Sequence, residues 1–155
     1  RFLFKLIVNY PSLDSERIIL QQNTRSNKIE EIKAIISKNE IIDAQKVIEE
    51  IYVDEKVEDY ILNLIFATRD PSNNGLEDLV GIIEYGASPR ATINLVRAAK
   101  ARAFTENRGY IIPEDIRNIG ADVLRHRIIL SYEAEAEELT SEDVIQRLFE
   151  VVEVP

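Results

Sequence analysis

Ser88, Pro89 and Arg90 are the residues whose types and spacing are best suited to chemistry. Serine is a favoured helix N-cap because its hydroxyl can accept a hydrogen bond from a free amide of the first turn. Proline at the next position costs nothing, since the first amides of a helix have no intrahelical partner. Arg90 then places a guanidinium where free amides and the helix dipole attract anions. Because a guanidinium matches phosphate oxygens, this pattern could form a phosphate site. The pattern alone favours the alternative, an ordinary surface arginine.

The helix that carries Arg90 is predicted to extend over residues 89–104. Gly86 allows a sharp approach of the chain to its first turn. Arg90, Asn94 and Arg97 share one face, with the two arginines about 10 Å apart along the axis. Arg97 is interpreted as part of a solvated polar face. The apolar face of the helix consists of Leu95, Val96, Ala99 and Ala103.

Capping residues and apolar periodicity predict further helices. Ser37 and Glu40 form a capping box, Asp54 caps the following helix, and Thr140 caps the last one. Apolar residues at helical spacing should give each of these helices a buried face. The predicted helices and apolar faces cover residues 13–22, 41–51, 57–65, 113–124 and 144–152.

Strands are predicted in only three short stretches. Residues 2–8 resemble a strand without a partner in the sequence, and residues 110–112 are expected to pair with 127–131. Gly109 should supply the cap that ends the central helix. A polar break is predicted over residues 23–28. The conformation of residues 29–36 is left open between a short helix and an extended segment. Residues 76–85 are predicted to be a connector of one or two helical turns. The fold class predicted is mainly α, with a short two-stranded β element.

Other side chains that could do chemistry receive structural interpretations. His126 lies between two arginines, whose charges disfavour its protonation, and the sequence offers it no nucleophile or metal partner. The acidic stretch 132–138 lacks the Asp/Asn and Gly pattern of a calcium loop and is predicted to be a solvated loop. No metal site is predicted. The sequence also lacks the glycine-rich phosphate loops and the common hydrolase motifs.

Composition sets the remaining limits. The chain has 155 residues, 45% of them hydrophobic, which is enough for one globular domain with a real core. A net charge of −9 argues against a general nucleic-acid or anionic-membrane surface. The absence of cysteine fits a reducing compartment, so we expect a cytoplasmic protein. The absence of Met and the apolar start at Arg1 predict a piece of a longer protein.

One long stretch resembles a known family. The run YGASPRATINLVRAAKARAFTENRGYIIPEDIRNIGADVLRHRIILSYEAEAE, with the VEVP ending, is similar to the C-terminal part of MoxR-family AAA+ ATPases. The opening RFLFKLIVNYPSLDSE resembles the end of that family's nucleotide-binding core. The resemblance implies that residues 1–10 end the core with its last strand and that residues 11–155 are the helical lid. The ATP-binding Walker A and Walker B segments are absent, so this piece alone would not be catalytic.

The family resemblance also implies roles for individual residues. Arg90 matches the sensor 2 arginine that reaches the γ-phosphate, and Ser88 and Pro89 would lie with it at the nucleotide. Arg1 matches an arginine-finger candidate that reaches the ATP of the next subunit. Guanidinium groups in such positions stabilise the charge that develops during phosphoryl transfer. The implied cofactors are ATP and Mg²⁺, held mainly by the core. The implied partners are neighbouring subunits of a homo-oligomeric ring, a hexamer, and a client protein.

Two other functions stay open on the residues alone. The first is a free-standing, non-catalytic helical module that binds a partner protein. The second is a winged-helix-like nucleic-acid binder built from residues 109–131, with Arg117, Arg125, His126 and Arg127 as a local basic cluster. The net charge argues against the second, and binding of that kind should weaken steeply with salt.

Overall fold

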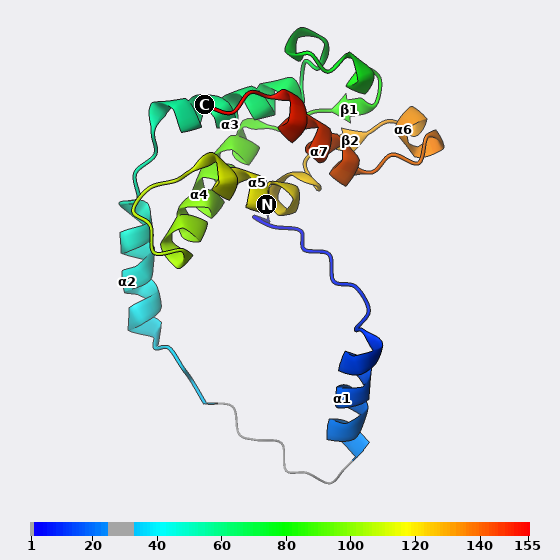
Figure 1. The fold of residues 1–155 in the computed structure, drawn as a ribbon. Helices are drawn as coiled ribbons and strands as arrows, with labels where there is room; N and C mark the ends of the chain where they lie inside the picture. The colour runs from blue at the N-terminus through cyan, green and yellow to red at the C-terminus, as the bar shows by residue number, and fades with distance from the viewer. Residues whose placement is uncertain (1, 25–32) are drawn as a thin grey trace.

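The computed structural model describes residues 2–24 and 33–155, and these form a helical bundle with a small sheet (Figure 1). The helices are α1 (Leu13–Thr24), α2 (Lys38–Glu49), α3 (Glu55–Ala67), α4 (Pro89–Thr105), α5 (Pro113–Leu124), α6 (Tyr132–Ala136) and α7 (Ser141–Val151). Two 3-10 turns, η1 (Ser72–Asn74) and η2 (Glu77–Leu79), connect α3 to the sheet. The mainly α fold class is therefore confirmed.

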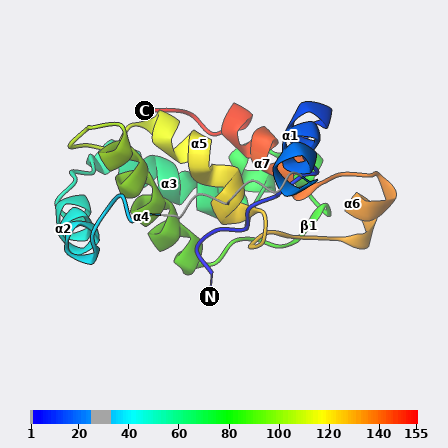
Figure 2. The same ribbon diagram turned by 90° about the horizontal axis from the view of Figure 1, so that it is seen from below.

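The core lies between α3, α4, α5 and α7. The predicted apolar face of α3, which includes Tyr60, Ile61 and Leu64, is fully buried. Leu95 and Ala99 of α4 are completely buried as well, and the small alanines let α4 lie close to α3 and α5. Figure 2 shows α4 and α5 in the middle of the molecule, with α2 and α6 at opposite ends.

The sheet uses a strand that the sequence did not predict. β1 (Ile83–Tyr85) pairs antiparallel with β2 (Ile129–Leu130), whereas residues 110–112 were the predicted partner of β2. That pairing is wrong: Tyr110 forms only an isolated parallel bridge with Tyr52. The physical reason is that the β1 stretch leads directly into α4, so packing of α4 on α5 brings it alongside the chain that leaves α5.

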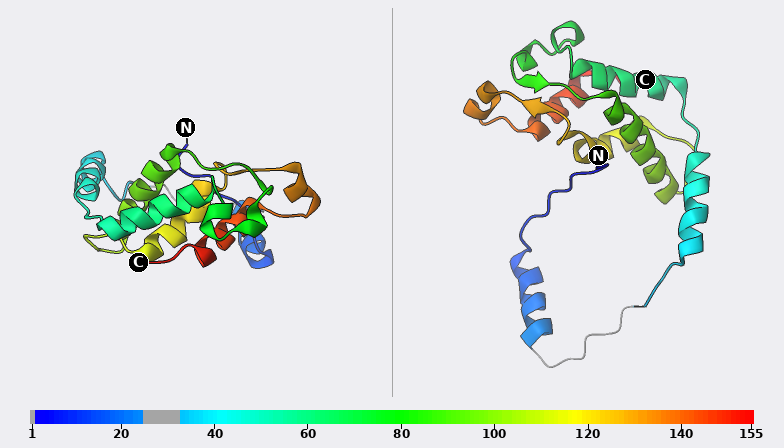
Figure 3. Two further views of the ribbon diagram at one scale, coloured as in Figure 1. Left: turned by 90° about the horizontal axis from the view of Figure 1, so that it is seen from above. Right: turned by 180° about the vertical axis from the view of Figure 1, so that it is seen from behind.

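The N-terminal segment departs from the predicted strand. Residues 2–10 have no strand structure, because a strand requires a second strand beside it and no strand among the described residues pairs with this segment. α1 forms as predicted, but it buries no residue and stands apart from the bundle (Figures 1 and 3). The predicted break at 23–28 and the first part of 29–36 lie largely outside the described residues.

Two other segments differ from the prediction in burial or in structure. The capping box of Ser37 and Glu40 is present at the start of α2, yet the expected apolar face stays mostly exposed, Ile41 and Val47 included. The stretch 132–138 contains the short helix α6 rather than only a loop, because Ala134 is buried and its amide donates to Ser131 Oγ.

The turn after α4 is also capped differently from the prediction. Asn107 takes the left-handed conformation, with φ 55°, and Gly109 does not. Asparagine tolerates this region better than most residues, because its short polar side chain can bond locally to the backbone. The predicted role of Gly109 as the cap is therefore wrong.

Candidate functional site

The turn before α4 is fixed from the end of α3. Thr68 Oγ1 donates to the carbonyl of Ile65 at 2.7 Å and accepts from the amide of Ala87 at 2.9 Å. Arg69 Nε donates to the carbonyl of Ala87 at 2.7 Å, while its guanidinium lies over the ring of Phe66. The start of α4 is thus held from both sides by one short stretch of chain.

Gly86 is required by a close approach of two backbones. A Cβ built on this residue would lie 2.4 Å from the carbonyl oxygen of Thr68 and 2.9 Å from the Cα of Arg69. Any side chain there would push the turn away from α3. The glycine therefore determines where α4 begins, and with it the position of Arg90.

Ser88 and Pro89 begin α4 as predicted, with one difference. Ser88 has the extended backbone of an N-cap, and Pro89 is the first helical residue. The Ser88 hydroxyl, however, makes no capping hydrogen bond to the first turn. The prediction of the cap position is confirmed and that of the hydroxyl bond is wrong, because the contacts of Thr68 and Arg69 with Ala87 orient the turn instead.

Arg90 and Arg97 extend from the same side of α4 into the solvent. Within residues 2–24 and 33–155, neither arginine forms an ion pair with a carboxylate. Together with Leu3, Ile93 and the nearly buried Asn94, they line a pocket of about 360 Å³. Two such arginines in one pocket, with Arg90 in the first turn of α4, make a suitable environment for an anion.

Arg127 adds a third positive charge near this pocket. Its Nε donates to the carbonyl of Val123 at 2.8 Å, and its side chain contacts the carbonyl of Phe2. Burial, followed by the nearby charge of Arg90, lowers the pKa of Arg127 below its ordinary value. Among the described residues no carboxylate pairs with Arg127, so α4 and the chain that follows α5 bring two like charges near one another.

His126 is structural in this arrangement. Its Nε2 lies 3.3 Å from the carbonyl of Phe2, whereas its Nδ1 is buried without a hydrogen-bond partner. Burial is the main cause that lowers its pKa, the hydrogen bond to Phe2 acts in the opposite direction, and the charge of Arg127 lowers the pKa further. A neutral ring with its proton on Nε2 fits these contacts.

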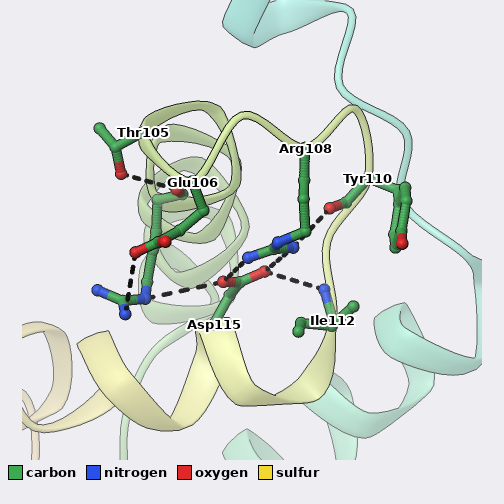
Figure 4. A network of polar contacts seen from close by, with 7 residues as sticks. Thr105, Glu106, Arg108, Tyr110, Ile112 and Asp115 are labelled. Atoms are coloured by element: carbon green, nitrogen blue, oxygen red, sulfur yellow. Dashed lines mark hydrogen bonds and ion pairs between the residues drawn. The ribbon is translucent and has the colours of Figure 1, made fainter.

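The opposite end of α4 is tied to α5 by a buried ion pair (Figure 4). The carboxylate of Asp115 accepts two hydrogen bonds from the guanidinium of Arg108, at 2.8 and 2.5 Å, and one from the amide of Ile112, at 3.0 Å. The Asp115 side chain is only 2% exposed. The sequence indicated Asp115 as a first-turn acid of α5 but not this pairing, which fixes the axis of α4 relative to α5.

The basic cluster of the winged-helix alternative is engaged in contacts within the chain. Arg117 donates to the carbonyl of Phe149 at 2.8 Å, and Arg125 pairs with Asp122 and Glu142 at 2.5 and 2.6 Å. The two strands that this alternative needed do not pair with one another. These residues belong to contacts within the bundle.

The predicted site residues do not all lie in the part of the chain that the structure describes. Arg90, Ser88 and Pro89 lie together at the start of α4, while Arg1 lies outside the described residues. Thr68 and Arg69 were missed, because their role depends on a contact between segments far apart in the sequence. The role of Arg127 near Arg90 was missed as well, although the basic run after Leu124 was a visible signal.

Searches for other kinds of site gave negative findings. Among the described residues, no group of three or more His, Cys, Asp or Glu side chains could hold a metal ion. In the same part of the chain, every helix is too short or too polar to cross a bilayer.

Comparison with known proteins places this geometry in a family. Residues 81–148 match the family model described as the AAA lid domain. The whole chain is 37% identical to "Chaperone MoxR1" of Mycobacterium tuberculosis and covers 41% of that protein. It is also 39% identical, over 62% of its own length, to "Protein MoxR" of Paracoccus denitrificans, of which it covers 30%. A solved structure titled as a "putative ATPase" from Cytophaga hutchinsonii is 41% identical, with a TM-score of 0.94 over the whole chain and 47% of that protein.

The chain spans less than half the length of each of these relatives. The family model begins at Gly81 and includes the turn and helix that carry Arg90. The chain therefore belongs to the MoxR family of AAA+ ATPases and contains the family's helical lid domain.

Proposed function

We propose that this chain is the lid that closes over ATP bound to a nucleotide-binding core and that couples hydrolysis to a change of conformation. Arg90 is the residue that binds the γ-phosphate, as the sensor 2 arginine. The observation that carries the proposal is the position of Arg90 and Arg97 in one pocket, where neither arginine has a carboxylate partner within the described part of the chain. Guanidinium groups without an internal counter-charge are available to bind the oxygens of a polyphosphate.

The other residues of the site have supporting roles in this proposal. Ser88 and Pro89 define the helix N-terminus that faces the phosphate. ATP and Mg²⁺ are held mainly by the core, and the Mg²⁺ ion supplies charge neutralisation at the phosphates. Arg1 acts as the arginine finger toward the next subunit. The protein works as a cytoplasmic homo-oligomeric ring, a hexamer, that acts in a chaperone-like way on a client protein and uses neither nucleic acid nor a membrane.

The test is ATP turnover by the longer protein in which this chain is joined to its core. Arg90→Ala should lower kcat by roughly 10-fold to 150-fold, the effect of losing a hydrogen bond to a charged group worth about 1.5–3 kcal/mol. Its free energy of unfolding should change by less than about 0.5 kcal/mol, because Arg90 is exposed and makes no structural contact in the described residues.

Arg147→Ala is the matched control. Arg147 lies on α7 and forms an exposed ion pair with Asp78. Its replacement removes the same charge as Arg90→Ala and should leave kcat unchanged. Wild-type turnover in Arg90→Ala, with the control also normal, would contradict the proposed role of Arg90.

A partner-binding module is a second candidate function, and one observation favours it. An open groove of about 900 Å³ lies between α2, α3 and α4, with Ile48, Leu62 and Val96 in its walls. If Arg90→Ala leaves turnover unchanged while Leu62→Lys abolishes binding of a client, the interaction function is the better one.

A further inference from the structure

The main chain of residues 2–5 is bound along the C-terminal end of α5. The amide of Lys5 donates to the carbonyl of Asp122 at 2.9 Å. The guanidinium of Arg125 donates to the carbonyl of Lys5, and that of Arg127 donates to the carbonyl of Phe2. Figure 1 shows the N-terminal end of the chain beside α5, separated from it by more than a hundred residues of sequence.

These contacts involve the backbone of the segment and not its side chains. The ring of Phe2 is 76% exposed and adds little apolar burial, whereas Leu3 and Phe4 are 36% and 40% exposed and cover part of their side chains. Two carbonyls and one amide of residues 2–5 are satisfied by α5, in the way that a neighbouring strand would satisfy them. The end of α5 therefore serves as a polar binding surface for an extended peptide backbone.

The arginines of this surface are also held by groups outside the segment. Arg125 is 10% exposed and is fixed by Asp122 at 2.5 Å and Glu142 at 2.6 Å. Burial alone would lower the pKa of Arg125, but hydrogen bonds to these two carboxylates outweigh burial and raise it. Arg127 is fixed by the carbonyl of Val123. Side chains that are already ordered lose little further entropy when they bind a carbonyl.

The same docking joins the segment to the pocket of Arg90. Leu3 lies between the two anchored residues and lines the pocket with Arg90, Asn94 and Arg97. Arg127 contacts the segment directly, and the charge of Arg90 adds to burial in lowering the pKa of Arg127. A shift of residues 2–5 would therefore move one wall of that pocket.

We propose that Arg125 and Arg127 are positioning residues that fix the main chain of residues 2–5 on the end of α5 and so link the path of this segment to the placement of Arg90. The link to ATP turnover rests on the proposed function, whereas the docking itself does not. A motion of the segment relative to the lid then changes the phosphate-facing pocket without any contact between Arg127 and the nucleotide.

The first measurement is residue-resolved hydrogen exchange of the Lys5 amide in the full 155-residue chain. The wild type should protect this amide, and Arg127→Lys, which keeps the charge but loses the guanidinium fork, should speed its exchange by about 10-fold. Amides of α3 are the internal reference for global stability, and Arg147→Ala is the control variant. An unprotected Lys5 amide in the wild type would overturn the docking, as would unchanged exchange in Arg127→Lys.

The second measurement is a double-mutant cycle on ATP turnover in the longer protein. Arg127→Lys should lower kcat with little change in KM, and adding it to Arg90→Ala should cause no further loss, since Arg127 acts through Arg90. Additive losses would refute the link. If Arg90→Ala alone has no effect, the proposed function fails while the exchange result still decides the docking.

Discussion

Replacing Gly86 by alanine tests how the start of α4 is positioned. The added Cβ would lie 2.4 Å from the carbonyl oxygen of Thr68, about 0.6 Å short of the 3.0 Å that such atoms keep. The contacting atoms belong to the backbone, so no side-chain rotation can relieve the contact. Forced overpacking of this kind costs about 1–3 kcal/mol. The hydrogen bond from Ala87 to Thr68 lies in the same contact and should weaken with it.

Gly109→Ala is the matched control for this prediction. A Cβ at Gly109 would meet no atom within 4 Å, and its φ lies outside the left-handed region. Alanine at such a position should stabilise the protein by about 0.4–1 kcal/mol, because it restricts the unfolded chain.

The assay is chemical denaturation of the two variants and the wild type. We expect Gly86→Ala to unfold at a lower denaturant concentration than the wild type, and Gly109→Ala at an equal or higher one. In the longer protein, Gly86→Ala should also lower ATP turnover, since the turn that carries Arg90 must shift. Equal midpoints for Gly86→Ala and the wild type would refute the inference that this backbone contact holds α4.

Two further predictions concern the ends of the helices. Asp115→Ala should lower the free energy of unfolding by about 3 kcal/mol, because it leaves Arg108 without its partner; a loss below about 1 kcal/mol in denaturation would contradict this. Ser88→Ala should change the free energy of unfolding little, whereas Thr140→Ala should lower it by about 1 kcal/mol. The reason is that the side chain of Thr140 makes a capping hydrogen bond and that of Ser88 does not. Hydrogen bonds from Thr140 lower the pKa of Asp143, so the stability that these bonds provide is complete at neutral pH and is lost in acid. The difference in free energy of unfolding between Thr140→Ala and the wild type should therefore narrow as the pH falls through the range in which Asp143 titrates.

Local sequence signals gave the helices accurately. α5 begins at Pro113 and ends at Leu124 as predicted, because a first-turn proline with adjacent acids is a strong start signal. The capping boxes at Ser37 and Thr140 are likewise present. Each of these features depends on residues within a few positions of one another, so the sequence alone contains the needed information.

Contacts between distant segments were decided by the tertiary structure. The partner of β2 is β1 and not residues 110–112, because α4 and α5 bring those two strands together. The face of α2 looked like a core face and is exposed, since helical spacing indicates amphipathicity but not what covers it.

The same distinction between local and distant contacts applies to the candidate site. Ser88, Pro89 and Arg90 are adjacent in the chain, and their spacing alone determined a helix start with an arginine beside it. Arg127 lies 37 positions further on and comes near Arg90 only when α5 packs against α4. The sequence thus determined where the helix that carries Arg90 begins. Only the packing of helices decided which distant groups share its pocket, because such contacts depend on how whole faces fit together and not on spacing along the chain.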